Sequence, residues 1–142
     1  MSECVFCEIV AGAEEAAVLL SDPVCMVILD VRPVNPGHVL ILPKNHHEGI
    51  VDMPSADFVH IAEVAHEFAR HMREAFTDVE GINILMSEGE AASQSVGHSH
   101  MHVIPRKEGD SMKLESDDPF VGMAELDRIA NLWSQVQDRS KK

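Results

Sequence analysis

The sequence of 142 residues contains no tyrosine, and aromatic residues make up only 4% of it. Aliphatic side chains and methionine must therefore fill the core, and the length suits one domain. No apolar run approaches the roughly 20 residues that a helix needs to cross a bilayer, since segments such as Val24 to Leu29 are much shorter. The start Met1-Ser2-Glu3 lacks the positive region of a secretory leader. We therefore predict a cytoplasmic protein with no membrane partner.

Positive charge is also scarce: the chain has 11 Lys and Arg residues against 24 Asp and Glu residues, which gives a formal net charge of −13. Polynucleotide backbones repel such a chain, which excludes a nucleic-acid polymer as a partner but not a small phosphate ligand. Three cysteines are too few for a disulfide framework. The spacing of Cys4 and Cys7 indicates metal or redox chemistry, and too few residues precede Cys4 for a thioredoxin-like strand. Cys25, in an apolar segment, is predicted to lie in the core.

The apolar pattern predicts an antiparallel sheet. Short apolar runs bounded by turn residues are typical of strands. We expect strands at residues 18–20, 24–29, 39–42, 82–86 and 99–104. The order of strands, helix, strands and helix favours an α+β fold over a βαβ fold.

Two amphipathic helices complete this prediction. Apolar residues from Phe58 to Phe76 recur at spacings of three and four, which predicts a helix over residues 54–76. Either Asp52 or Ser55 can cap it. The second helix lies near the C-terminus and carries Trp133, which we expect to pack in the core.

Nine histidines are present, and three of them alternate along one predicted strand as His98, His100 and His102. Alternate residues of a strand share a face, so these three side chains should point together. A merely solvated polar face is the weaker interpretation. One metal ion cannot bind all three, because His98 and His102 lie about 13 Å apart while metal–nitrogen bonds are about 2.0–2.1 Å long. The three histidines must therefore have different roles.

Cys4 and Cys7 have the spacing of half a zinc site. Two histidines are needed to complete a tetrahedral set of two thiolates and two imidazoles. His46 or His47, together with His98, are the candidates.

If His98 holds a metal, His100 and His102 remain available for chemistry. A neutral imidazole is a competent nucleophile toward phosphorus, and a second residue such as His38 can fix its tautomer. The small polar loop at residues 87–97 can supply backbone N–H groups and the side chains of Gln94 and Ser95 to a phosphate, although such a loop is by itself most often a turn.

These residues resemble the histidine-triad (HIT) family of nucleotide-binding proteins. The strongest match is the segment from Gln94 to Arg106, which contains the three alternating histidines. Other segments match in the same order: Cys4 to Gly12, Ile28 to Pro33, Pro36 to His38, Leu42 to His46 and Gly81 to Asn83.

The resemblance implies an antiparallel sheet of about five strands per subunit, one long central helix, a C-terminal helix and a homodimer. It implies a single domain over residues 1–142, with a motif-bearing core at 4–106 and a loop and helix at 107–142. The branch of the family with an N-terminal Cys-x-x-Cys binds structural zinc. Carried onto this chain, the zinc ligands are Cys4, Cys7, His46 and His98.

The resemblance also implies an enzyme that acts at the α-phosphate of nucleoside monophosphate derivatives, such as adenosine phosphoramidates. His100 attacks and becomes nucleotidylated, His102 contacts the phosphate and helps the leaving group depart, and His38 supports the triad by hydrogen bonding. The alternatives are a dinucleoside-polyphosphate hydrolase and a weakly catalytic, zinc-stabilised nucleotide sensor or interaction module.

The implied ligand is a purine nucleotide resembling AMP. Asp30 binds the ribose hydroxyls, as suits a carboxylate acceptor. The implied base pocket consists of Val5, Phe6, Ile9, Leu29 and Val31, and the implied phosphate contacts are Ser87, Ser93, Gln94 and Ser95. The chain departs from the usual pattern, which has Asn at Ser87, Gly at Ser93, a large residue at Gly97 and an apolar residue at Ser99.

Overall fold

The computed structural model describes residues 3–116 and 119–140, with side chains described as far as residue 137. The chain divides into two compact units, Met1–Met112 and Lys113–Lys142. The single domain over residues 1–142 therefore remains a prediction. The elements are α1 (Val5–Val10), β1 (Val18–Ser21), β2 (Cys25–Leu29), β3 (Val39–Pro43), α2 (Ser55–Ala75), β4 (Gly81–Met86), the 3₁₀ turn η1 (Glu90–Ala92), β5 (Met101–Arg106) and α3 (Met123–Ser140).

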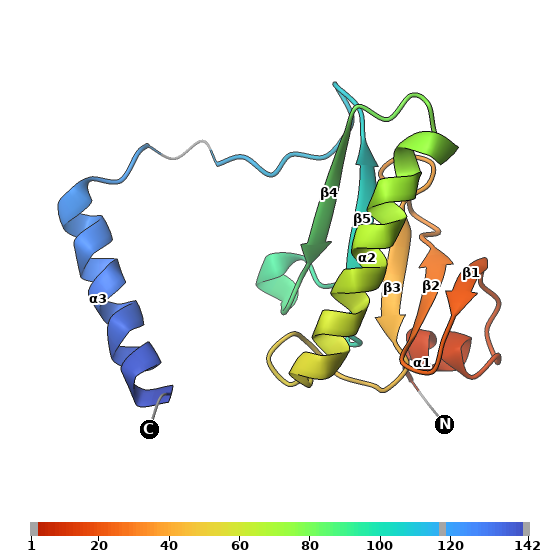
Figure 1. The fold of residues 1–142 in the computed structure, drawn as a ribbon, viewed down its shortest axis with the longest axis horizontal. Coiled ribbons are helices and arrows are strands. Elements are labelled where there is room, and N and C mark those ends of the chain that lie inside the picture. Colours follow the sequence, from red (N-terminus) through yellow and green to blue (C-terminus); the bar gives the residue numbers. More distant parts are fainter. Residues whose placement is uncertain (1–2, 117–118, 141–142) are drawn as a thin grey trace. The chain divides into compact units, whose positions relative to one another are not determined.

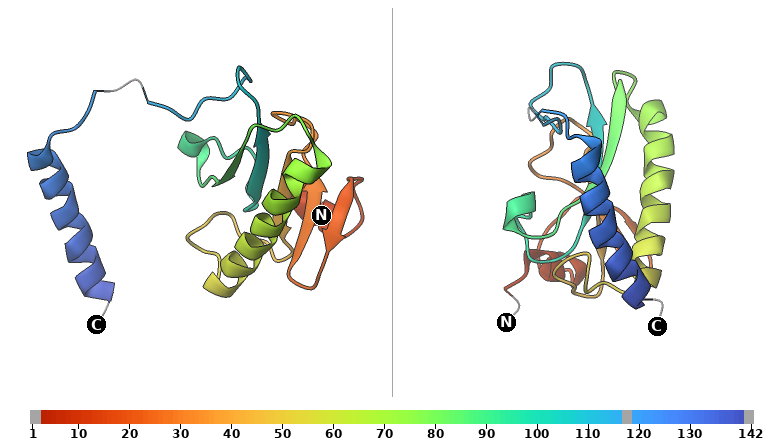
Figure 2. Two further views of the ribbon diagram at one scale, coloured as in Figure 1. Left: turned by 45° about the horizontal axis from the view of Figure 1, so that its top comes forward. Right: turned by 90° about the vertical axis from the view of Figure 1, so that its left-hand side faces the viewer.

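The first unit is built around a five-stranded sheet with the order β1-β2-β3-β5-β4, in which every neighbouring pair is antiparallel (Figure 1). The long helix α2 covers one face of this sheet, and the short helix α1 lies on the other (Figure 2). The predicted α+β architecture, with a long central helix and a C-terminal helix, is confirmed.

Side-chain alternation along the strands divides the apolar residues between two cores. Val27 and Ile41 belong to the core that packs against α2. Their neighbours on the opposite face, including Leu40, pack against Phe6 of α1. His102 lies opposite Leu40 in the register of β5 and β3. Its side chain therefore lies on the α1 face of the sheet, away from the long helix.

The helix α2 begins at Ser55 and is not capped by either predicted residue. Pro54 occupies the cap position with φ of −59° and makes no side-chain cap bond. The Asp52 carboxylate instead accepts hydrogen bonds from the backbone N–H groups of Glu48 and Gly49 in the preceding turn. A proline with a fixed φ sets the start of this helix without a polar cap.

The strand β5 begins at Met101, two residues later than predicted, and continues to Arg106. Before it, the backbone N–H of Ser99 donates to the carbonyl oxygen of His47 at 2.6 Å. That bond takes Ser99 out of the strand ladder and bends the chain around His98. His98 and His100 therefore precede β5, and only His102 lies within it.

The second unit contains α3, whose described side chains are all exposed. Trp133 is 65% exposed, so the prediction that it packs in a core is wrong. The periodicity of an amphipathic helix shows that one face is apolar, but it does not show what covers that face. Among the described residues, no helix has the length and hydropathy needed to span a bilayer.

Candidate functional site

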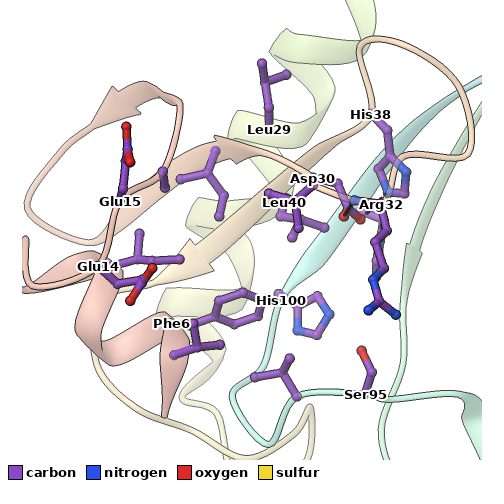
Figure 3. Close-up of a pocket in the computed structure, with 17 residues that line it drawn as sticks. Phe6, Glu14, Glu15, Leu29, Asp30, Arg32, His38, Leu40, Ser95 and His100 are labelled. Atoms are coloured by element: carbon purple, nitrogen blue, oxygen red, sulfur yellow. Dashed lines mark hydrogen bonds and ion pairs between the residues drawn. The ribbon is translucent and has the colours of Figure 1, made fainter.

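A cavity of about 610 Å³ opens on the α1 face of the sheet (Figure 3). Its walls come from α1 and the segment after it, from β2 and the segment that leaves it, from β3, and from the chain that leads into the triad. The lining residues are Val5, Phe6, Ile9, Glu14, Glu15, Ala16, Ile28, Leu29, Asp30, Val31, Arg32, His38, Leu40, Ser95, Val96, His100 and His102. The structure thus brings together most of the residues that the sequence proposed for catalysis and substrate binding.

Three predicted phosphate contacts lie elsewhere: Ser87, Ser93 and Gln94 do not line this cavity. The Gln94 amide instead ties its own loop together, because its nitrogen donates to the carbonyl oxygen of Val96 at 2.9 Å and its oxygen accepts from the Gly89 N–H at 2.7 Å. Ser93 has φ of 68°, in the left-handed region that favours glycine. A glycine, usual in the family at this position, relieves that conformation.

His100 stands at the centre of the cavity wall. Its Nδ1 lies 2.8 Å from the carbonyl oxygen of His98, and this bond requires the proton on Nδ1. Phe6 packs edge-on against the imidazole, with ring centroids 5.1 Å apart. Burial lowers the pKa of His100, so the ring is neutral at pH 7. Its Nε2 therefore carries an unshared electron pair.

His38 and His102 form a directed hydrogen-bonded pair. The Val34 N–H donates to His38 Nδ1 at 3.1 Å, so the proton of neutral His38 resides on Nε2. That nitrogen lies 2.9 Å from His102 Nδ1 and donates to it. Burial, reinforced by the neighbouring imidazoles, lowers the pKa of His102 to about 4. Neutral His102 therefore carries its proton on Nε2 and is a hydrogen-bond donor.

Asp30 lies at the end of β2 beside this pair. Its Oδ2 is 3.5 Å from His38 Nε2, and its Oδ1 accepts the Arg32 N–H at 2.8 Å. The Arg32 side chain lines the same cavity but was not among the predicted site residues. A lone arginine between Val31 and Pro33 has no pattern that distinguishes it from a solvated surface charge.

A second cluster lies beside the cavity, where α1, the end of β3 and the approach to β5 meet. The ligand atoms of Cys4, Cys7, His46 and His98 all lie within 4.8 Å of one another. Cys4 Sγ is 3.3 Å from His98 Nδ1, and Cys7 Sγ is 3.2 Å from His46 Nδ1. Sulfur and nitrogen ligands of a tetrahedral zinc ion lie roughly 3.5 Å apart, given bonds of about 2.3 and 2.0–2.1 Å. The cluster fits that geometry.

The orientation of His98 supports the same fit. Its Nε2 lies 2.8 Å from the carbonyl oxygen of Pro43 and donates to it, so the unshared pair is on Nδ1, which faces the thiols. A backbone acceptor behind a ligating imidazole is the usual support of a metal-binding histidine. His47, the alternative to His46, points elsewhere, with Nε2 3.3 Å from an Asp57 carboxylate oxygen.

The third cysteine belongs to a different arrangement. Cys25 is fully buried, as predicted, and burial raises the pKa of its thiol to about 12. His60 Nε2 lies only 2.7 Å from the carboxylate of Asp22, which also accepts the Cys25 N–H at 2.7 Å. Asp22 therefore holds His60 and the backbone of Cys25 through direct hydrogen bonds of ordinary length.

An antiparallel sheet with a cavity lined by His38, His100 and His102, beside a cluster of two cysteines and two histidines, defines a histidine-triad protein. The family model of the HIT domain matches residues 11–109, and the chain belongs to this family.

Similar proteins of known structure share the fold. A zinc-bound histidine-triad protein from Mycobacterium smegmatis is 38% identical, with a TM-score of 0.73 over 82% of this chain and 84% of that one. A HIT family protein from Bacillus subtilis is 31% identical, with a TM-score of 0.86 over 94% and 96%.

Two relatives carry named activities. An adenylylsulfatase of Arabidopsis thaliana is 34% identical over 111 residues, 78% of this chain and 56% of that protein. An adenosine 5′-monophosphoramidase of Candida albicans is 30% identical over 110 residues, 75% of this chain and 72% of that protein.

Proposed function

We propose that the protein hydrolyses nucleoside 5′-monophosphate derivatives at the α-phosphate through a nucleotide bonded covalently to His100. The observation that carries this proposal is the bond from His100 Nδ1 to the His98 carbonyl, which leaves Nε2 as an unprotonated nucleophile in the cavity. Attack by Nε2 forms a phosphorus–nitrogen bond and breaks the bond to the leaving group. Water then attacks the same phosphorus and releases the nucleoside monophosphate and free His100.

His102 and His38 serve the leaving group in this proposal. Since His38 donates to His102 Nδ1, the remaining N–H of His102, a residue of the cavity wall, is available to donate to a substrate oxygen. A donor fixed before reaction stabilises the charge that develops as the phosphorus bond breaks. His38 acts through His102 and is held in turn by the backbone N–H of Val34.

The remaining walls of the cavity suit a purine nucleoside. Phe6 and Ile9 are buried residues of α1 and supply an apolar surface for a base. Asp30 offers carboxylate oxygens at the rim, where they can accept hydrogen bonds from ribose hydroxyls. The named activities of the two relatives, both on adenosine monophosphate derivatives by their names, favour AMP-like substrates.

Structural zinc at Cys4, Cys7, His46 and His98 belongs to the same proposal. The ligand distances and the zinc-bound relative support it. When bound, zinc supplies a rigid link between α1, the end of β3 and the chain before β5.

A homodimer and a cytoplasmic location remain predictions. β4 lies at an edge of the sheet with Ile84 47% exposed, which leaves a strand edge open for a second copy.

A substrate panel tests the proposed function. We expect turnover of adenosine 5′-phosphoramidate and adenylyl sulfate, with AMP as the common product. A preference for dinucleoside polyphosphates would instead favour the first alternative function. Binding of AMP without turnover of any panel member would favour the nucleotide sensor and contradict the proposal.

The pH dependence of activity should reflect the low histidine pKa values. Burial lowers the pKa of His102 to about 4 and also lowers that of His38. We therefore expect kcat/KM to stay constant from pH 8 to about pH 5.5 and to fall at lower pH, well below the ordinary histidine value of about 6.5. A loss of activity centred near pH 6.5 would contradict the neutral, buried pair.

Circular dichroism is the control for this profile. The folded pKa values lie below the unfolded value, so the unfolded chain binds more protons than the folded one as pH falls from about 6.5. The stability that these histidines contribute is present above that value and is lost as pH falls through the folded pKa, about 4 for His102. Rates are compared only where the spectrum is unchanged.

Ser87→Asn should raise kcat more than it lowers KM for the phosphoramidate. Ser87 directly follows β4, is half-buried and does not line the cavity. An asparagine side chain is longer than that of serine and carries two N–H donors. A single well-placed donor to the charge that develops on the phosphate raises the rate by about 10²–10³. Steady-state kinetics measure the effect. An unchanged or reduced kcat would show that this position does not limit catalysis.

A further inference from the structure

Glu14 and Arg32 lie on opposite sides of His100 in the cavity, and Asp30 lies beside Arg32. Figure 3 shows Glu14 beside Phe6, at the apolar end, and Arg32 on the other side of His100, extending toward Ser95. Arg32 is the only lysine or arginine among the residues described as lining this cavity. The cation therefore lies on the side of His100 away from Phe6.

The backbone of Arg32 is fixed by its neighbours, whereas its guanidinium has no bonding partner among the described residues. Its N–H donates to Asp30 Oδ1, and Pro33 follows it, which restricts its backbone to extended conformations. Arg106 and Arg128 each form an ion pair with a neighbouring carboxylate. Among the described residues, the Arg32 guanidinium makes no hydrogen bond or ion pair, so its donors are available to a ligand.

We propose that Arg32 binds the leaving group and selects substrates in which that group is a tetrahedral oxyanion, such as sulfate or phosphate, rather than an amine. The inference rests on the proposed function. With the base against Phe6 and the α-phosphate at His100, the rest of the substrate extends toward Arg32. A guanidinium has a planar set of donors that matches two oxygens of an oxyanion.

The step balances without any further reactant. His100 Nε2 attacks phosphorus, and the bond between phosphorus and the bridging oxygen breaks. The electron pair stays on that oxygen, so sulfate departs as a dianion paired with Arg32. Water then cleaves the phosphorus–nitrogen bond, so that adenylyl sulfate and water give AMP, sulfate and two protons. An amine leaving group departs neutral after protonation and gains little from a guanidinium.

The test compares full-length wild type with Arg32→Gln on adenylyl sulfate and on adenosine 5′-phosphoramidate. We expect kcat/KM to fall about 10- to 100-fold for the sulfate and less than about 3-fold for the phosphoramidate, the range expected for a charged hydrogen bond. Arg32→Lys should recover part of the loss, because it restores charge without the planar donors. Arg70→Gln, at an exposed position of α2, is the matched control and should change neither rate.

The Kd of AMP, which lacks a leaving group, separates the possible roles of Arg32. An unchanged Kd in Arg32→Gln supports the inference and shows an intact nucleoside pocket. Equal losses on both substrates, or AMP binding weakened about tenfold, would mean that Arg32 holds the shared α-phosphate and would overturn the inference alone. Failure of wild type to cleave either substrate would overturn the proposed function and this inference together.

Discussion

His100→Ala should lower turnover of every substrate by more than about 10⁴-fold, the scale seen when a covalent nucleophile is removed. AMP binding should change little, because the apolar walls and Asp30 remain in place. Alanine keeps the backbone and removes only the imidazole whose Nε2 faces the cavity. Steady-state kinetics and AMP titration measure the two effects separately.

Two observations complete this test. Wild type quenched during turnover should show an added nucleotidyl mass that maps to His100, and His100→Ala should show none. His66→Ala, at an exposed position of α2, is the matched histidine control and should behave as wild type. Multiple turnover by His100→Ala, or an adduct on another residue, would rule out the proposed mechanism.

Cys7→Ser should lose zinc and melt about 10 °C lower than wild type, since a domain of this size loses roughly 3 °C for each kcal/mol. Without a thiolate at this position, the set of four ligands is incomplete. Zinc binding to such a set is coupled to folding, so a lost ligand lowers the free energy of unfolding. Metal analysis of protein purified without chelator should give one zinc per chain for wild type, and calorimetry measures the melting temperature.

The adjacent pair His46 and His47 gives the sharpest control. His46→Ala should lose zinc, because His46 Nδ1 lies beside the thiol of Cys7. His47→Ala should keep it, because His47 bonds to Asp57 instead. Zinc retained by His46→Ala and lost by His47→Ala would reverse the assignment, and a metal-free wild type would contradict it.

Strand alternation predicted only part of the cavity wall. The period of two predicted that His98, His100 and His102 share a face, but only His102 lies within β5. The structure places His100 and His102 in one cavity and His98 beside the thiols. The choice between His46 and His47 was different, because neighbouring residues of an irregular segment have no fixed relative direction. It depended on the carboxylate of Asp57, ten residues away and close only after folding.

Other features depend on contacts that no local pattern contains. Gln94 looked like a phosphate contact, yet its amide closes its own loop through Gly89 and Val96. Arg32 was not among the predicted site residues, yet the turn formed with Asp30 places it on the cavity wall. The Ser99 hydroxyl is buried with no hydrogen-bond partner among the described residues, at a position where the family usually has an apolar side chain.

The group that fixes the tautomer of His100 is a main-chain carbonyl, that of His98, and not a side chain. Every amino acid supplies such a carbonyl, so this control is not encoded by the identity of residue 98. The imidazole of His98, by contrast, is specific to the thiol cluster. A substitution at position 98 can therefore remove the proposed zinc ligand and still leave the proton of His100 on Nδ1, provided that the path of the backbone is preserved. The proposed zinc site and the proposed nucleophile thus depend on different parts of one residue, the zinc site on the side chain of His98 and the nucleophile on its backbone.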